Sequence, residues 1–319
     1  MTQVLLDTDI GTDVDDALAL ALLIAEADVE LVGVTTVHGH APLRAAVARS
    51  LLEVSEKRHV PVVAGRSIPL RRSSVEGFHW NEMWGHEGAG VLSGEQRRIP
   101  DDNPTREDAA RFILRVAERV REPLGVVTVG PVTNLALALQ MEPGLAGALG
   151  PVTIMGGIVE RHMVAWPASF ETNLNSDPLA AAIVLGSGLD ITLVPLEVTL
   201  QVYLDGPDRE RLAGDGGPVS RRLVRLIEEM REPFAGFAAR YGLDGSHFDQ
   251  RTYLHDPLAV HVATGGTHAT LRDAAIAVEY EGQILRTIDH PERRPNMRVC
   301  SAVDGAAFVA DWMDAVVAV

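Results

Sequence analysis

Residues 7–18 read DTDIGTDVDDAL and connect two apolar runs, residues 4–6 before them and ALALALLIA at residues 17–25. The stretch contains five aspartates, at positions 7, 9, 13, 15 and 16. Carboxylates held this close together repel one another unless a positive charge lies among them. The pattern therefore predicts a buried strand, an acidic loop that holds a cation, and a buried helix.

The spacing of the aspartates favours a site for a hard divalent cation, because Ca²⁺ and Mg²⁺ bind carboxylate and carbonyl oxygens. Helix capping by Asp15 or Asp16 would explain one or two of the five residues only. An EF-hand loop is excluded, because Gly11 is its fifth residue instead of its sixth and Leu18 replaces the glutamate at position twelve. A phosphatase with an aspartate nucleophile would need Gly-Thr or a similar pair where this chain has Ile10 and Gly11.

Short β-rich runs alternate with helical patterns along the chain. Strands are expected at residues 4–6, 31–36, 60–64, 125–129, 152–155 and 191–195. Helices are expected at residues 16–26, 43–56, 107–121, 135–141, 178–185, 217–236 and 257–262. Continuous apolar strands separated by helices predict an α/β fold, with a mainly parallel, Rossmann-like open sheet and helices on both faces. A late β-rich addition, residues 274–298, is expected to form antiparallel strands or a hairpin.

Length, charge and cysteine content narrow the class of protein. The 319 residues contain no Gly/Ser-rich or Pro-rich linker, so we expect a single domain over residues 1–319. A net charge of −16 disfavours nucleic acid and anionic membranes as partners. One cysteine, Cys300, allows no internal disulfide and suits a reducing compartment. The N-terminus lacks a signal-peptide pattern, and the first apolar helix is shorter than the roughly 20 residues that cross a bilayer, so we expect a cytoplasmic protein.

Polar residues follow several expected strands at the same end. They are Asp7 and Asp9, then His38 and His40, and then the runs VGPVTN (129–134), MGG (155–157) and PLEVT (195–199). In open parallel sheets, ligands bind beyond the carboxyl ends of the strands. We therefore expect these loops to converge on one crevice.

The aspartate stretch resembles the signature D-x-D-x-G-x-D-D of the nucleoside hydrolases, the inosine–uridine preferring nucleoside N-ribohydrolase superfamily. This chain has two more residues between the glycine and the aspartate pair. Further motifs follow in the family's order: VTTVHGH (34–40), HEGAG (86–90), VGPVTNLALAL (129–139), IMGG (154–157), FETNLNSDP (170–178) and HDPLAV (255–260). Their shared order is more specific than any one of them.

This resemblance implies hydrolysis of the N-glycosidic bond of a ribonucleoside to free base and ribose, in purine or pyrimidine salvage. It implies one Ca²⁺, bound by Asp9, Asp16, Asp256 and the main-chain carbonyl of Val129. These ligands leave room for a water and two sugar hydroxyls within the about six to eight oxygens that Ca²⁺ takes. Asp9 would activate the metal-bound water as general base, and His255 would protonate the leaving base. The alternative for His255 is a structural histidine beside a metal ligand.

The resemblance also implies the residues that contact the substrate: Asp15, His40, His86, Met155, Glu171 and Asn173. Asp15 and Asn173 would bind the 2′- and 3′-hydroxyls of the ribose, and Glu171 would bind the opposite edge of the sugar. Met155 also fits an ordinary core position, and His86 an ordinary surface loop. Three aromatic residues in irregular segments could stack on the base or only fasten loops to the body: Trp80, Trp84 and Tyr241.

The chain departs from the family pattern at the ends of the site that would hold the base and the 5′-hydroxyl. His40 occupies a position where the family usually has asparagine, and Val164 or Ala165 occupies another. Two alternatives therefore stay open: a hydrolase of a non-standard N-riboside on the same fold, and a non-catalytic protein that binds ribose or nucleosides. The family further implies a homodimer or homotetramer, with a small-molecule substrate and neither nucleic acid nor membrane as partner.

Overall fold

An eight-stranded sheet forms the centre of the computed structural model, which describes residues 2–73, 83–120, 122–164, 170–240 and 250–319. The strand order is β3-β2-β1-β4-β5-β6-β12-β9, and all neighbours are parallel except β9, which runs antiparallel to β12. The strands are β1 (Thr2–Thr8), β2 (Val29–Thr36), β3 (Val62–Ala64), β4 (Gly125–Thr128), β5 (Val152–Met155), β6 (Ile191–Val194), β9 (Ala269–Ala274) and β12 (Met297–Val303). The expected mainly parallel α/β fold is confirmed.

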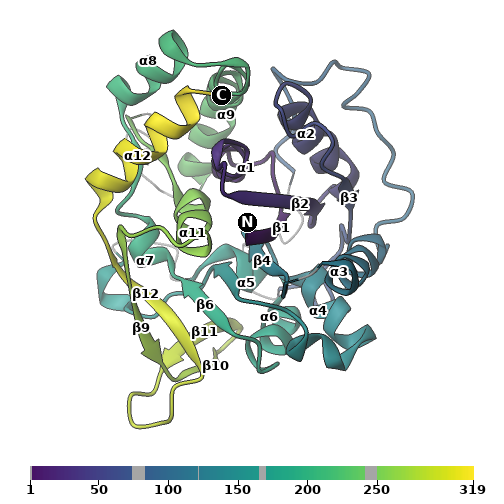
Figure 1. Cartoon of the computed structure of the whole chain (residues 1–319), viewed down its shortest axis with the longest axis vertical. Helices are drawn as coiled ribbons and strands as arrows, with labels where there is room; N and C mark the ends of the chain where they lie inside the picture. Colours follow the sequence, from purple (N-terminus) through teal and green to yellow (C-terminus); the bar gives the residue numbers. More distant parts are fainter. Residues whose placement is uncertain (1, 74–82, 121, 165–169, 241–249) are drawn as a thin grey trace.

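Helices cover both faces of the sheet (Figure 1). The helices that pack in the first layer are α1 (Asp15–Ala25), α2 (Ala41–Glu53), α8 (Gly206–Asp215), α9 (Pro218–Arg240), α11 (His255–Ala263) and α12 (Gly305–Val317). Those in the second layer are α3 (Asp108–Arg119), α4 (Thr133–Met141) and α6 (Pro178–Leu185). Short helices α5 (Thr172–Ser176) and α7 (Leu196–Thr199), with 3₁₀ turns at Pro143–Gly147 and Arg161–Met163, lie in the connections.

The alternation of side chains along β1 separates the two layers of the core. Val4 and Leu6 pack with the helices of the first layer, whereas Leu5 packs with those of the second. Successive side chains of a strand point to opposite faces, so a strand buried on both faces must be apolar throughout. This explains why β1 appears in the sequence as an uninterrupted apolar run.

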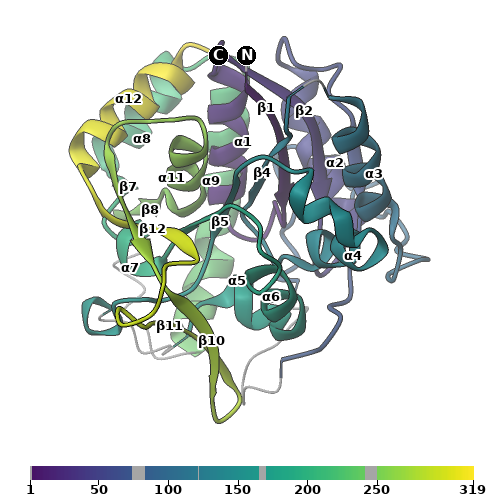
Figure 2. The same cartoon turned by 60° about the horizontal axis from the view of Figure 1, so that its bottom comes forward.

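The late β-rich stretch contributes to two sheets. A hairpin of β10 (Ile276–Glu281) and β11 (Ile284–Asp289) is antiparallel, as expected, and Figure 2 shows it projecting from the body. Strands β9 and β12 instead extend the main sheet beyond β6. Two short strands, β7 (Tyr203–Leu204) and β8 (Thr252–Tyr253), pair separately.

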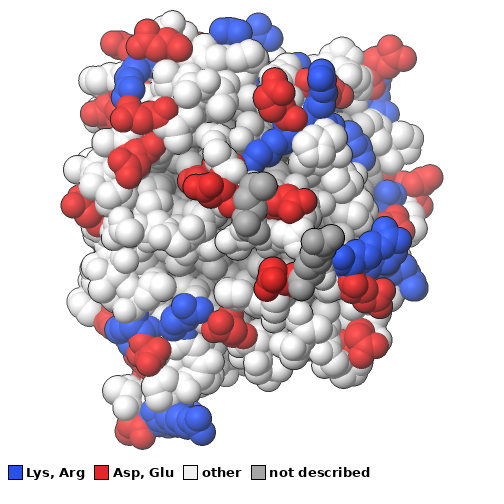
Figure 3. Space-filling view, viewed as in Figure 1, with Lys and Arg blue, Asp and Glu red and all other residues white. Residues whose placement is uncertain are grey.

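The topology places the site at a reversal of strand order. β1 lies between β2 and β4, so the connections that leave β1 and β4 diverge to opposite sides of the sheet. Such switch points form the ligand crevices of open parallel sheets. On the face shown in Figure 3, the described Lys and Arg side chains are scattered among Asp and Glu. Among the described residues, no helix combines the length and the apolar character needed to span a membrane.

Candidate active site

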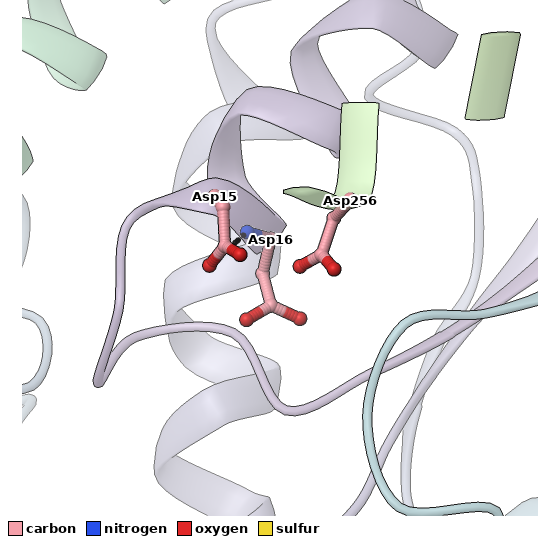
Figure 4. Close-up of side chains that lie close together, drawn as sticks. All are labelled: Asp15, Asp16 and Asp256. Carbon is pink, nitrogen blue, oxygen red and sulfur yellow. Dashed lines mark hydrogen bonds between the residues drawn. The ribbon is translucent and has the colours of Figure 1, made fainter. Parts of the chain in front are cut away.

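Three buried carboxylates form the centre of the site. Asp15 and Asp16 begin α1, and Asp256 is the second residue of α11, so two distant helices start at the same place. Each offers one oxygen to a group whose atoms all lie within 4.8 Å of one another. Figure 4 shows the three carboxylates facing a common space. Asp16 Oδ1 also accepts hydrogen bonds from the Thr8 hydroxyl and, at 3.1 Å, from the Asp9 amide.

Asp9 lies beside this group, on the loop that follows β1. A side chain at Gly130 would overlap with Asp9 Oδ1, so the Asp9 carboxylate rests directly against the loop that follows β4. Val129, the residue before that glycine, is buried, and its amide donates to the Asp7 carbonyl at 2.9 Å. The carbonyl of Val129 accepts a 2.8 Å hydrogen bond from Asn173 Nδ2.

Asp7 lies beneath the loop, at the end of β1. Its Oδ1 accepts hydrogen bonds from Thr35 Oγ1 at 2.6 Å and Asn134 Nδ2 at 2.8 Å. Its Oδ2 is buried and has no partner among the described residues. Burial raises the pKa of Asp7 to about 7, against the effect of the two hydrogen bonds. Hydrogen bonds from one residue of β2 and one residue of α4 thus hold the Asp7 carboxyl in place beneath the loop.

The electrostatics of the aspartates suit a site for a compensating cation. Burial raises the pKa of Asp9, Asp15, Asp16 and Asp256, and mutual repulsion raises the pKa of the last three further. Such a cluster of oxygen donors suits a hard divalent ion. The carboxylates of the close group differ in one member from those implied by the family resemblance, because the group contains Asp15 where the implied set has Asp9.

The residues expected to hold the sugar already have protein partners. Glu171 caps α5 and accepts hydrogen bonds from the amides of Asn173, Leu174 and Gly157. Asn173 Nδ2 lies 3.3 Å from both the carbonyl and the sulfur of Met155. These contacts bring Glu171, Asn173 and Met155 together at the carboxyl ends of β4 and β5.

His255 occupies the first position of α11, next to Asp256. Its ring stacks on Tyr253, with centroids 5.0 Å apart and planes 16° apart. Its Nδ1 lies 2.7 Å from Thr199 Oγ1, whose hydroxyl donates to the Leu196 carbonyl. The hydroxyl oxygen therefore accepts from Nδ1–H, which leaves Nε2 as the acceptor. Burial lowers the pKa of His255 to about 4, so the ring is neutral at neutral pH.

Two other residues predicted to contact the substrate, His40 and His86, form hydrogen bonds with the protein. His40 caps α2: its Nδ1 accepts from the Leu43 amide at 3.1 Å, and its Nε2 donates to the Ile99 carbonyl at 2.9 Å. Both nitrogens thus serve the protein instead of a sugar or base. His86 Nε2 bonds the Thr12 carbonyl at 2.9 Å.

Of the three aromatic residues expected near the base, only Trp84 lies in the described part of the chain. The Trp84 ring lies 6.0 Å from the His86 ring and 5.8 Å from the Phe234 ring, which ties its segment to α9. Trp80 and Tyr241 lie outside the described residues. The described contacts of Trp84 are those of a residue that fastens a loop to the body.

Sequence reasoning missed Arg44 and gave His38 only a place in one of the loops expected to converge on the crevice. Arg44, on α2, is 1% exposed and lies under the aspartate loop. His38 is the only residue other than glycine with a positive φ, 69°, in the described part of the chain. Burial lowers the pKa of His38 to about 3, and nearby Arg44 contributes to this. The arginine within an otherwise apolar run, PLRAAVA, was a usable signal, whereas nothing in the sequence marks the backbone of His38.

Comparisons with known proteins find relatives of the chain both in sequence and in fold. A family model described as inosine-uridine preferring nucleoside hydrolase matches residues 4–310. The probable uridine nucleosidase 2 of Arabidopsis thaliana is 27% identical, with 98% of this chain and 96% of the relative aligned. The pyrimidine-specific ribonucleoside hydrolase RihA of Enterobacter sp. (strain 638) is 29% identical, with 96% and 95% aligned.

Solved structures show the same fold. The purine-preferring ribonucleoside hydrolase from Gardnerella vaginalis superposes with a TM-score of 0.78 at 28% identity, covering 99% of this chain and 98% of that chain. A plant nucleoside hydrolase superposes with a TM-score of 0.80 at 24% identity, covering 100% and 99%. These matches extend over the loops that carry the site as well as the sheet.

Proposed function

The chain belongs to the inosine–uridine preferring nucleoside hydrolase family and is an N-ribohydrolase, and we propose that it works with Ca²⁺ at the aspartate cluster and Asp9 as general base. The products are the free base and ribose. The observation that carries the proposal is the close group of Asp15, Asp16 and Asp256 beside Asp9 at the switch point of the sheet.

The residues present fit a calcium ion. Asp16 and Asp256 would hold it with Asp9 and the Val129 carbonyl, and the position of Asp15 lets its carboxylate bind either the ion or a ribose hydroxyl. When bound, the ion would act as a Lewis acid that lowers the pKa of water and anchors the sugar hydroxyls. The Val129 carbonyl could still bind the ion, because its oxygen has two lone pairs and the hydrogen bond from Asn173 uses only one of them.

Asp9 would accept a proton from the attacking water as the water oxygen bonds to C1′ of the ribose and the C1′–N bond breaks. Its carboxylate is held in place by contact with Gly130. The sugar develops oxocarbenium character in such a reaction. The buried carboxylate of Glu171 would offset that positive charge, even though its hydrogen bonds come from the backbone.

His255 would deliver a proton to the leaving base. Because its pKa is about 4, the ring is neutral beforehand, so Nε2 would first take up a proton from solvent water, and it does so only when a partner stabilises the charged form. The electron pair of the breaking C1′–N bond moves onto the base, and the growing negative charge there would favour the imidazolium. Stacking on Tyr253 and the bond to Thr199 hold the ring in a fixed orientation for the transfer.

The choice of base is open among pyrimidines, purines and non-standard bases. Curated relatives carry uridine- and pyrimidine-directed names, whereas one structural relative is purine-preferring. A non-standard N-riboside stays a second candidate because of one observation, the engagement of both His40 nitrogens by protein partners. The position that resembles a family sugar or base contact is thereby used for helix capping.

A panel of nucleosides tests the proposal. Ribose release is measured from uridine, cytidine, inosine, guanosine and adenosine, with nicotinamide riboside as a non-standard substrate. The Asp9→Asn variant is measured beside the wild type at saturating Ca²⁺, where loss of the general base should lower kcat about 10²- to 10⁴-fold. Tight binding of ribose analogues without turnover of any substrate would instead indicate a non-catalytic binding protein.

A further inference from the structure

Arg44 is a buried cation with an unusual set of partners. Its side chain is 1% exposed. Its guanidinium donates to the carbonyl of Asp9, to the carbonyl of Ile10 at 3.1 Å, and to the carbonyl of His38 at 2.8 Å. Its Nη2 also donates to Thr12 Oγ1 at 3.0 Å. Four acceptors from two different loops, those that follow β1 and β2, thus converge on one side chain.

A buried cation is costly unless hydrogen bonds and opposing charge compensate it. The described salt bridges include none between Arg44 and a carboxylate, so its direct partners are uncharged oxygens and the sulfur of Met83. Carbonyl oxygens fixed by a guanidinium cannot turn away without losing that compensation. The shape of the loop from Asp9 to Thr12 is therefore coupled to the position of Arg44.

The hydroxyl of Thr12 extends this network to a second segment. It accepts from Arg44 and donates to Glu87 Oε1 at 3.3 Å. The buried Glu87 carboxylate in turn accepts the amides of Trp84 and Gly85. Thr12 lies in the longer connection between the glycine and the aspartate pair. Hydrogen bonds of Thr12 to Arg44 and to Glu87 thus hold this longer connection in place.

We propose that Arg44 is a positioning residue that holds the aspartate loop, residues 9–14, so that Asp9 and Asp16 point into the cation site. The inference rests on the proposed function. The backbone of Asp9 is fixed at both ends: its carbonyl by Arg44 and its amide by Asp16 Oδ1. The planar fork of arginine offers N–H donors on three nitrogens in fixed directions to the four oxygen acceptors, whereas the ammonium of lysine has fewer donors and carries all of them on one nitrogen.

The same helix provides a matched control. Arg49 also lies on α2, in the half of the helix that is further from the aspartates in sequence. Its Nη2 donates to the carbonyl of Val62 at 2.8 Å. Its replacement removes an arginine-to-carbonyl hydrogen bond without touching the aspartate loop. Differences between variants at positions 44 and 49 therefore separate positioning of the site from general stabilisation.

The experiment compares Arg44→Lys, Arg44→Met and Arg49→Met with the wild type. The midpoint of Ca²⁺-dependent thermal stabilisation is measured first, and then kcat and KM at saturating Ca²⁺. Both Arg44 variants should raise the Ca²⁺ midpoint and lower kcat by about 10- to 100-fold, the usual effect of losing a residue that supports a metal ligand. Arg49→Met should lower Tm and leave the Ca²⁺ midpoint and kcat at wild-type values.

Thr12→Val is the milder variant if Arg44→Met fails to fold, and it should shift the midpoint in the same direction by a smaller factor. Arg44→Lys with a wild-type midpoint and kcat would overturn the proposal, as would a wild type that binds no divalent cation. If the wild type binds Ca²⁺ but hydrolyses no nucleoside, the proposed function fails. The Ca²⁺ midpoints of the Arg44 and Arg49 variants then still decide whether Arg44 positions the site.

Discussion

Gly130 lies so close to Asp9 that no side chain fits between them. A Cβ at position 130 would overlap with Asp9 Oδ1 and lie 2.9 Å from the Asp9 amide nitrogen. The glycine therefore allows the carboxylate that we assign as general base to rest on the loop after β4.

We predict that Gly130→Ala lowers kcat by about 100-fold, because a displacement of about 1 Å in a reacting group has an effect of that size. The measurement is steady-state hydrolysis of the preferred nucleoside. Gly147→Ala is the matched control, since a Cβ there would meet nothing within 4 Å. Equal activities of the two variants would show that Asp9 needs no such contact.

Removal of a carboxylate from the buried group should abolish the response to calcium. A ligand at 100 times its Kd stabilises a protein by about 2.7 kcal/mol, which corresponds to a rise in Tm of roughly 5 °C. We expect this rise in the wild type and not in Asp16→Asn or Asp256→Asn, measured by thermal unfolding with and without Ca²⁺. Asp102→Asn, at a side chain that is 85% exposed, should respond as the wild type does. An unchanged response of the two buried variants would place the ion elsewhere.

His255→Ala should separate protonation of the leaving group from the rest of catalysis. We predict a loss of about 10²-fold or more in kcat for nucleosides, the usual contribution of a general acid. Hydrolysis of 4-nitrophenyl riboside should change little, because its leaving group departs without a proton. Equal losses for both substrates would instead assign His255 a structural role beside Asp256.

We predict that the protein loses stability at alkaline pH because the thiol of Cys300 is buried. Burial raises its pKa from 9.0 to about 11. Between these values the unfolded chain releases the thiol proton and the folded chain keeps it, so the free energy of unfolding falls as pH rises. The full difference is roughly 2–3 kcal/mol.

Urea unfolding at pH 8 and pH 10.5 tests this effect. The wild type should lose more stability over this interval than Cys300→Ala, which carries no thiol to titrate. The contribution of the protonated Cys300 thiol to the free energy of unfolding is fully present below pH 9. Parallel pH dependences of the two proteins would show that the thiol ionises as readily in the folded state as in the unfolded state.

The fold was predictable where a local pattern carried the information. The apolar run before Asp7 is a central strand because both faces of the sheet are covered, and the helix after Asp16 is buried for the same reason. Helix α12 also had a readable signal that was missed, since Phe308, Trp312 and Val316 recur every four residues and are buried. The joining of β12 to β6 had no such signal, because strand pairing between distant segments depends on the whole topology.

The candidate site was predictable as a set of residue types and much less as a set of contacts. The sequence indicates that aspartates gather near position 9. The three carboxylates that lie within 4.8 Å of one another, however, include Asp15 and not Asp9. The second partner of His40, the Ile99 carbonyl, could not be recognised from the sequence, because it lies 59 residues away. Arg44 illustrates the same limit: helical periodicity places it on a buried helix and does not tell which carbonyls it meets.

The central claim is that a divalent cation held by the aspartates is required for hydrolysis of the N-glycosidic bond. The most direct measurement is ribose release by protein freed of metal with a Ca²⁺-selective chelator, with removal verified by elemental analysis, before and after Ca²⁺ is restored. We predict that the metal-free protein is inactive and that Ca²⁺ restores the rate, with Mg²⁺ less effective because it requires stricter octahedral geometry. Full activity of verified metal-free protein would contradict the account.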